Sequence, residues 1–139
     1  MNEDLKKGDI VLAPLSYSDL VNKKLRPSLV LYHDKDVMQL TVAYISSKVP
    51  TNPGPCDIVI PLGTPASTRA GLVYSSVVKV CWIAMVKRIL VSRKLGEADT
   101  DLRKKVNMVL PSALSIHGRL IVLSAENGLM ALRVLRDFA

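Results

Sequence analysis

The chain has 139 residues, 49% of them hydrophobic, and its 19 basic and 12 acidic side chains give a formal net charge of +7 at pH 7. This length fits one domain of ordinary size, and the hydrophobic content excludes a disordered protein. The positive charge favours a polyanionic partner, either nucleic acid or an acidic protein, whereas an aromatic content of 4% argues against modules that stack bases on rings in a sheet.

The apolar runs are too short or too interrupted to span a bilayer. The N-terminus carries Glu3 and Asp4 where a signal peptide would carry only basic residues, and no long apolar run follows. We therefore expect a cytoplasmic protein that makes no membrane contact. In a reducing compartment Cys56 and Cys81 are expected to remain thiols and to pack as small apolar core residues.

Short apolar runs rich in β-branched residues, separated by clusters of Pro, Gly, Asn and Asp, predict an antiparallel sheet and a mainly β fold that forms a small barrel. The predicted strands are residues 9–14, 26–33, 38–45, 56–60, 76–80 and 84–90. Between the first two strands, residues 15–24 form a polar connection long enough to cover the strand ends as a flap. Residues 49–55, with three prolines, and residues 61–71 are predicted loops.

The C-terminal part is predicted to be helical. Asp99 or Thr100 can cap a helix with Leu102, Val106 and Val109 on one face, and Pro111 is expected to stop or kink it. Further on, residues 129, 132 and 135 are leucines on one helical stripe, which predicts a closing amphipathic helix. We therefore divide the chain into a domain of residues 1–110 and an extension of residues 111–139 packed on the same domain.

Several short blocks occur in a fixed order along the chain. They are Gly-Asp-Ile-Val at 8–11, Lys-Leu-Arg-Pro-Ser-Leu-Val-Leu at 24–31, Tyr-Ile-Ser-Ser-Lys at 44–48, Ala-Gly-Leu at 70–72, Ser-Ser-Val-Val-Lys at 75–79 and Arg-Lys-Leu-Gly at 93–96. In this order the blocks resemble the MazF/PemK (Kid-like) family of toxin endoribonucleases, over roughly residues 6 to 110.

The resemblance implies an SH3-like β-barrel with C-terminal helices that acts as a homodimer. It also implies an mRNA interferase, a nuclease that cuts single-stranded RNA at short sequences without a metal or other cofactor and leaves a cyclic phosphate and a 5′-hydroxyl. The partner would be an acidic antitoxin with an initially disordered segment that enters the basic groove.

Arg26 is the predicted catalytic cation. A guanidinium is always charged and can bind two phosphate oxygens at once, which suits it to stabilise a phosphorane. Pro27 limits the backbone freedom just after Arg26, and the Arg-Pro pair matches the position of the family's catalytic arginine. From chemistry alone a surface ion pair of Arg26 with Asp9 or Asp19 is the more common outcome.

Ser46 is the second predicted catalytic residue, at a position where the family usually has threonine, and Ser47 adds another hydroxyl. A hydroxyl can donate to a phosphate oxygen or orient the ribose 2′-hydroxyl, but it is a weak acid without assistance. The alternative is that both serines only end a strand. Lys24, Ser47, Lys48 and Lys79 are the predicted substrate-binding residues, and Lys23 is a further basic neighbour.

The general base is not identified by the sequence. Some relatives have an acidic residue two positions after the base that Lys79 matches, but here that position is Cys81. Asp19 or Asp34 could replace it, or substrate positioning could supply most of the rate. A site built from His33 and His117 is disfavoured, because His117 lies in the part of the chain without resemblance.

Two other functions stay open at this point. One is a gyrase poison of the CcdB type, which shares the barrel and acts through a C-terminal protein interface. The other is a catalytically impaired relative that binds nucleic acid or an antitoxin, as Cys81 suggests.

Overall fold

The structure of the protein is a computed structural model. It describes residues 4–15, 24–114, 119–124 and 130–135, the last two ranges by their backbone only. Residues 16–23 of the predicted flap, which include Asp19 and Lys23, and also His117 lie outside the described residues. None of the helices in these ranges has the length and hydrophobicity needed to cross a membrane.

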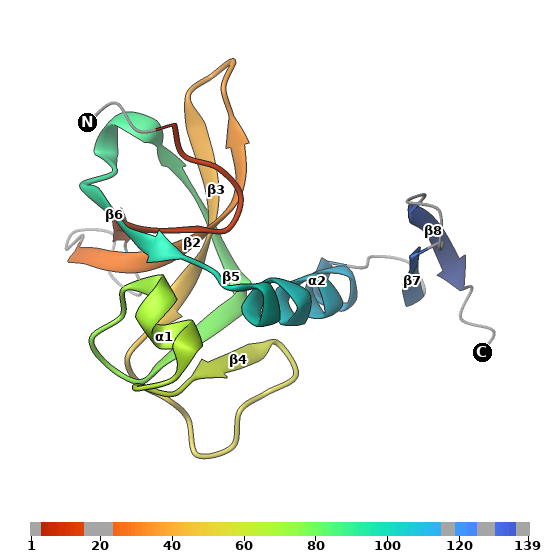
Figure 1. The fold of residues 1–139 in the computed structure, drawn as a ribbon. Helices are drawn as coiled ribbons and strands as arrows, with labels where there is room; N and C mark the ends of the chain where they lie inside the picture. The colour runs from red at the N-terminus through yellow and green to blue at the C-terminus, as the bar shows by residue number, and fades with distance from the viewer. Residues whose placement is uncertain (1–3, 16–23, 115–118, 125–129, 136–139) are drawn as a thin grey trace.

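Six antiparallel strands form one curled sheet, a half-barrel that confirms the predicted mainly β, SH3-like fold (Figure 1). Across the sheet the strands follow the order β4-β5-β3-β2-β1-β6. Their bounds are β1 (Asp9–Leu15), β2 (Lys24–Asp34), β3 (Gln39–Ser46), β4 (Asp57–Ile60), β5 (Ser76–Lys87) and β6 (Arg93–Glu97).

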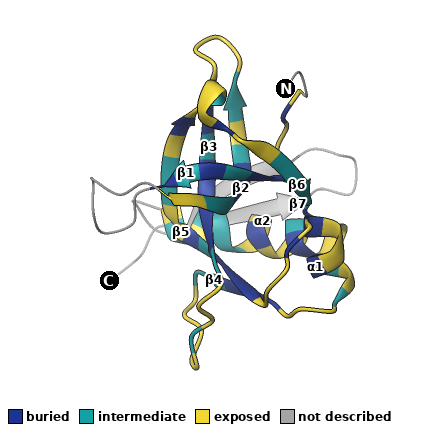
Figure 2. Cartoon of the chain, turned by 90° about the vertical axis from the view of Figure 1, so that its left-hand side faces the viewer, coloured by how far each residue is buried: buried dark blue, intermediate teal, exposed yellow. Residues whose placement is uncertain are grey.

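The curled sheet is buried on both faces, as the dark segments of its central strands indicate (Figure 2). One face packs against helix α1 (Pro65–Ala70) and helix α2 (Thr100–Leu114) through Ala70, Leu102 and Val106. The other face encloses a second cluster that includes Val30, Val42 and Tyr44 and no residue of either helix. The two faces follow from the period-2 alternation of side chains along each strand.

Strand β5 is one strand where the sequence predicts two, 76–80 and 84–90. Its pairing with β3 passes from Tyr44↔Lys79 directly to Ala43↔Ile83, so three residues of β5 bulge out of the ladder. The predicted interruption falls at this bulge. Beyond it the strand ends at Lys87, and residues 88–90 form the short 3-10 turn η1 (Arg88–Leu90).

Helix α1 and strand β6 were not predicted. Helix α1 lies within the predicted loop 61–71. Thr64 is its N-cap and accepts from the backbone N–H of Ser67, Pro65 starts the helix, and Gly71 ends it at φ 71°. These are ordinary helix signals in a segment only six residues long. Strand β6, which pairs with β1, lacks the β-branched residues that indicate a strand.

The C-terminal predictions are partly wrong. Helix α2 does not stop at Pro111 but continues to Leu114, because proline removes only one N–H donor near the end of the helix. The predicted closing helix is instead strand β8 (Met130–Leu135), paired with β7 (Arg119–Ser124) in a separate two-stranded sheet. The apolar runs in both segments are rich in Leu, Val and Ile and suit a hairpin, which lies beyond α2 in Figure 1.

The cysteine prediction is wrong as well. Cys56 and Cys81 form a disulfide with their Cα atoms 5.9 Å apart. Cys81 lies in the β5 bulge and is exposed, and Cys56 is half-buried just before β4, so neither packs in the core as a thiol. The pairing of β4 with β5 brings the two residues together, which their separation of 25 residues in the sequence does not reveal.

Strands β1 and β6 are joined by an ion-pair cluster. Lys94 lies 3.0 Å from Glu97 and 3.4 Å from the buried Asp9, and Arg69 lies 3.2 Å from Glu97. The hydrogen bond from Lys94, followed by the one from Arg69, lowers the pKa of Glu97 below its ordinary value of 4.5. The hydrogen bond to Glu97 likewise raises the pKa of Lys94.

The variant Glu97→Gln should therefore lose stability only where Glu97 is ionised. Because the folded-state pKa is lowered, the stabilisation is complete above pH 4.5 and is lost as the pH falls through the lowered value. Thermal unfolding should show a Tm some degrees below that of the wild type at pH 7 and no difference at pH 2. An equal deficit at both pH values would contradict this explanation.

Candidate functional site

Four neighbouring strands place Lys79, one of the predicted site residues, in a row with Ser28, Tyr44 and Asp57. Tyr44 on β3 pairs with Ser28 on β2 and with Lys79 on β5, and Lys79 pairs in turn with Asp57 on β4. Residues directly opposite each other in an antiparallel ladder project from the same face of the sheet. Since Tyr44 packs in the core cluster away from the helices, the row lies on the face that the helices do not cover.

Arg26 and Ser46 lie at one end of this row. Arg26 lies two residues before Ser28, where β2 begins, and Ser46 lies two residues after Tyr44, where β3 ends, just past the last pair Ser28↔Tyr44 of the ladder. Both residues are partly exposed, and neither is sealed in the core. The sequence prediction of an arginine and a hydroxyl at neighbouring strand ends thus agrees with the geometry.

The guanidinium of Arg26 is held but not fully satisfied. Its Cζ lies 5.6 Å from the centroid of the Tyr44 ring, within the range of a cation–π interaction. Its Nε is buried and has no hydrogen-bond acceptor among the described residues. The predicted alternative, an ion pair with Asp9, is wrong, because Asp9 contacts Lys94 and accepts from the backbone N–H of Lys6. A buried donor without a partner favours an anionic ligand here.

The backbone beneath Arg26 is also fixed. The buried hydroxyl of Ser28 donates to the Arg26 carbonyl at 3.3 Å, and Pro27 lies opposite Leu12 of β1. Lys24, two residues before Arg26 on β2, is exposed. Because side chains alternate along a strand, Lys24 adds a second positive charge on the same face.

At the end of β3, the Oγ of Ser46 accepts from the backbone N–H of Lys48 at 3.1 Å. This turn orients the Ser46 side chain and leaves its O–H available as a donor. Ser47 and Lys48 are exposed on the loop that follows. The structure therefore brings Arg26, Ser46 and their basic neighbours to one end of the sheet.

Lys79 lies farther along the row, in a less exposed position. Its Nζ is 3.2 Å from Oδ1 of Asp57 and 5.1 Å from the centroid of the Trp82 ring, and its side chain is only 17% exposed. The Trp82 ring lies 5.7 Å from that of Tyr44 and is 41% exposed, because Trp82 belongs to the β5 bulge. Tyr44 is thus a core residue, and Trp82 lies at the surface beside it.

The sequence did not identify Asp57, whose carboxylate contacts the predicted site residue Lys79. Asp34 cannot serve there, because it ends β2 about 26 Å along the strand from Arg26. Cys81 is in the disulfide and cannot act as a base. Only the pairing of β4 with β5 could have revealed Asp57, and its local sequence gives no such signal.

Histidine and metal chemistry find no support in the described ranges. The Nδ1 of His33 lies 2.7 Å from the carbonyl oxygen of Leu5, as expected for a structural imidazole. In residues 4–15 and 24–114 no group of three or more His, Cys, Asp or Glu is close enough to hold a metal ion.

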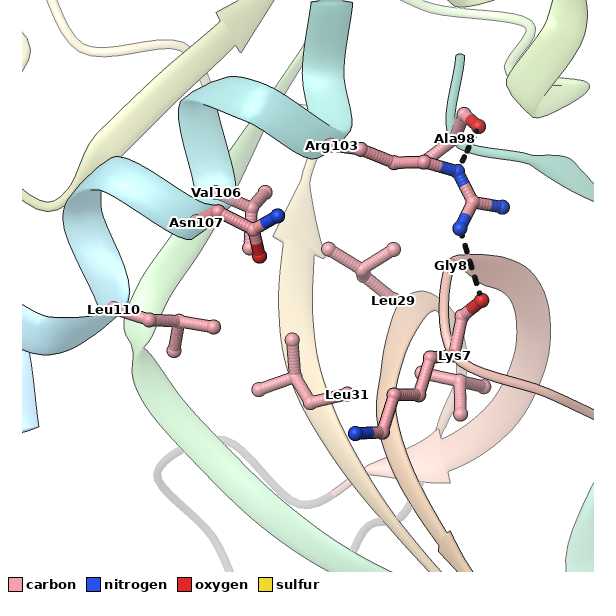
Figure 3. Close-up of a pocket in the computed structure, with 10 residues that line it drawn as sticks. Lys7, Gly8, Leu29, Leu31, Ala98, Arg103, Val106, Asn107 and Leu110 are labelled. Carbon is pink, nitrogen blue, oxygen red and sulfur yellow. Dashed lines mark hydrogen bonds between the residues drawn. The ribbon is translucent and has the colours of Figure 1, made fainter. Parts of the chain in front are cut away.

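A cavity of about 290 Å³ lies between α2, β2 and the turn before β1 (Figure 3). Its lining is mostly apolar, with the polar side chains of Lys7, Arg103 and Asn107, and none of the predicted site residues lines it. Arg103 donates to the carbonyls of Ala98 at 2.9 Å and Lys7 at 3.2 Å. These bonds tie α2 to the turn before β1. The guanidinium lies so close to Gly8, whose φ is 92°, that a Cβ at this position would collide with it.

A curled antiparallel sheet with cations and hydroxyls on its helix-free face defines a small β-barrel protein with a site suited to an anionic ligand. The family model described as "PemK-like, MazF-like toxin of type II toxin-antitoxin system" matches residues 6–114. The chain therefore belongs to this toxin family, as its sequence blocks indicate. None of the curated protein sequences compared with the chain matches it.

Solved structures of toxins share the fold at low sequence identity. MazF from Deinococcus radiodurans is 19% identical, with a TM-score of 0.64 over 83% of this chain and 100% of that chain. An endoribonuclease in complex with its cognate antitoxin from Mycobacterial species is 16% identical, with a TM-score of 0.62 over 81% and 97%. The Mycobacterium tuberculosis toxin MazF-mt6 is 20% identical, with a TM-score of 0.58 over 76% and 94%.

Replacing Arg103 by methionine should lower the free energy of unfolding by about 1–2 kcal/mol, because two backbone carbonyls lose their donor. Urea denaturation measures the change. The exposed Lys104 on the same helix provides the control, and Lys104→Met should change stability by less than about 0.5 kcal/mol. Equal losses in the two variants would show that Arg103 does not join α2 to β1.

Proposed function

We propose that the protein is a sequence-specific, metal-independent endoribonuclease toxin that cleaves single-stranded RNA. One observation carries the proposal: Arg26 and Ser46 stand at neighbouring ends of β2 and β3, each two residues from the pair Ser28↔Tyr44, in a row that leads on to Lys79 on the helix-free face of the sheet. Membership of the toxin family and the fold shared with two proteins described as endoribonucleases support it.

In this proposal Arg26 stabilises the charge that develops on the phosphorane. The Tyr44 ring and the bond from Ser28 to the Arg26 carbonyl hold the guanidinium before substrate arrives. A donor held in place stabilises a transition state without reorganisation during the reaction. The unsatisfied Nε would gain a phosphate oxygen as its acceptor.

Ser46 donates its hydroxyl proton to a phosphate oxygen or orients the ribose 2′-hydroxyl for attack. Its Oγ already accepts from the backbone N–H of Lys48, so its O–H remains free to donate. Attack by the 2′-oxygen gives the cyclic phosphate, and the leaving 5′-oxygen takes a proton. Lys24, Ser47, Lys48 and Lys79 bind the RNA phosphates on either side.

Partners follow from the same family membership. One half-barrel offers little concave surface, so a homodimer would provide the length of groove that an RNA strand needs. An acidic antitoxin is the proposed protein partner, since the chain has a net charge of +7 and one similar toxin structure contains a cognate antitoxin. The proposed location is the cytoplasm, where mRNA would be the substrate.

A second candidate is a catalytically impaired toxin that binds RNA or an antitoxin without cutting. The observation that favours it is the disulfide at Cys81, which leaves no carboxylate at that position of β5. We favour the nuclease, because proper positioning and a fixed cation can supply much of the rate without a dedicated base.

The first test is cleavage of a long RNA in excess EDTA. The wild type should cut at discrete sites, and Arg26→Ala should lower the rate about 100-fold or more. The matched control is Arg93→Ala, which removes an exposed arginine of β6 and should leave the rate within about twofold. No cleavage by the wild type above the Arg26→Ala background would eliminate the nuclease and favour the second candidate.

Binding can be followed through Trp82, the single tryptophan of the chain. Because Lys79 lies 5.1 Å from its ring, a phosphate that contacts Lys79 should change the emission. A 2′-O-methyl oligoribonucleotide, which cannot be cleaved, should give a saturable change that weakens at high salt. Lys79→Gln, which leaves no ammonium beside the ring, should abolish most of the change, and an unchanged wild-type spectrum at saturation would place the RNA elsewhere.

A further inference from the structure

The surroundings of Lys79 indicate a role for Asp57 that the sequence does not suggest. Asp57 and Lys79 have side chains only 14% and 17% exposed, and the distance between Oδ1 and Nζ is 3.2 Å. The charged Nζ is held between Asp57 and the Trp82 ring, whose centroid lies 5.1 Å away. A half-buried ammonium on a flexible side chain needs such a partner to keep one position.

Asp57 is itself held by its own turn and by the neighbouring strand. Its Oδ2 accepts from the backbone N–H of Gly54 at 2.9 Å, and its own N–H donates to the Gly54 carbonyl at 3.1 Å. The preceding residue, Cys56, accepts from the N–H of Val80 at 3.0 Å. The carboxylate is therefore aimed at Lys79 by the start of β4.

The disulfide reinforces this arrangement. Cys56 adjoins Asp57, and Cys81 lies between Val80 and Trp82 in the β5 bulge. The covalent bond ties the exposed loop of residues 47–55 to β5 at the point where the ladder of β4 begins. It restrains the two segments that carry Asp57 and Trp82, the two groups in contact with Lys79.

We propose that Asp57, held by the Cys56–Cys81 disulfide, is a positioning residue that fixes Lys79 in the RNA site. This inference rests on the proposed function. Asp57 acts through Lys79, which meets the phosphate, and takes no part in the bond changes. Reduction by dithiothreitol, which is oxidised to its cyclic disulfide while two thiols form, loosens Asp57 and lowers turnover. The site is thereby sensitive to the thiol redox state.

The main test is Asp57→Asn, which keeps the shape and removes the charge. We expect kcat to fall about tenfold while KM stays within about twofold, because a misplaced group affects the transition state more than binding. Asp57→Glu should recover part of kcat. Asp4→Asn, which breaks the exposed pair with Lys35, is the control and should leave kcat unchanged. Unchanged kcat in Asp57→Asn overturns the inference.

A double-mutant cycle separates positioning from a general structural effect. If Asp57 acts through Lys79, Asp57→Asn should change kcat by less than about twofold in a Lys79→Gln background. Independent, multiplying effects of the two substitutions overturn the inference. Thermal unfolding of each variant reports whether the fold is kept.

The disulfide is tested on the unmutated protein. Its intact mass should rise by two hydrogen atoms on reduction, and kcat should fall about threefold with dithiothreitol. The Cys56→Ser, Cys81→Ser double variant should have the lower kcat with or without reductant. If reduction changes the mass and leaves kcat unaltered, the disulfide has no part in positioning.

Trp82 fluorescence gives a readout that needs no RNA. In free protein, Asp57→Asn and Lys79→Gln should alter the emission in the same way, and the double variant should resemble Lys79→Gln alone. If this pattern holds while the wild type cuts no RNA, the placement of Lys79 stands and the nuclease proposal fails. If RNA is cut but the pattern is absent, the nuclease stands and the role of Asp57 fails.

Discussion

The pairing of β3 with its two neighbours is the constraint on which the rest of the site depends. Because Tyr44 lies opposite Ser28 on one side and Lys79 on the other, the cations of β2 and β5 project from one face. A shift of register by one residue would turn one of these side chains into the helix-packed core. The buried alternation of Val30, Val42 and Tyr44 prevents such a shift, so the hydrophobic core also determines the site.

The two faces of the sheet have different tasks. Helices α1 and α2 close one face, and Arg103 joins α2 to the turn before β1. The other face keeps an aromatic strip, Tyr44 and Trp82, between Arg26 and Lys79. The Tyr44 ring restricts Arg26 without neutralising it, which suits a group that must still meet a phosphate, whereas Lys79 is held by both the Trp82 ring and Asp57.

The β5 bulge and the disulfide act on the same small region. The bulge turns Cys81 and Trp82 outward, and the bond to Cys56 brings the start of β4 against it. The same contacts place Asp57 on Lys79. Cys81, at the position where the family resemblance allows an acidic residue, is thus part of a crosslink. The carboxylate in this region is that of Asp57, on the adjacent strand β4.

The sequence by itself determined the barrel class, most strand positions, the start of helix α2 and the family resemblance, because these depend on local periodicity and short motifs. It misjudged β8 and the cysteines, and it missed β6 and Asp57. These features depend on which strands become neighbours. Cys56 and Cys81, like Asp57 and Lys79, meet only when β4 pairs with β5, and no local pattern records that pairing.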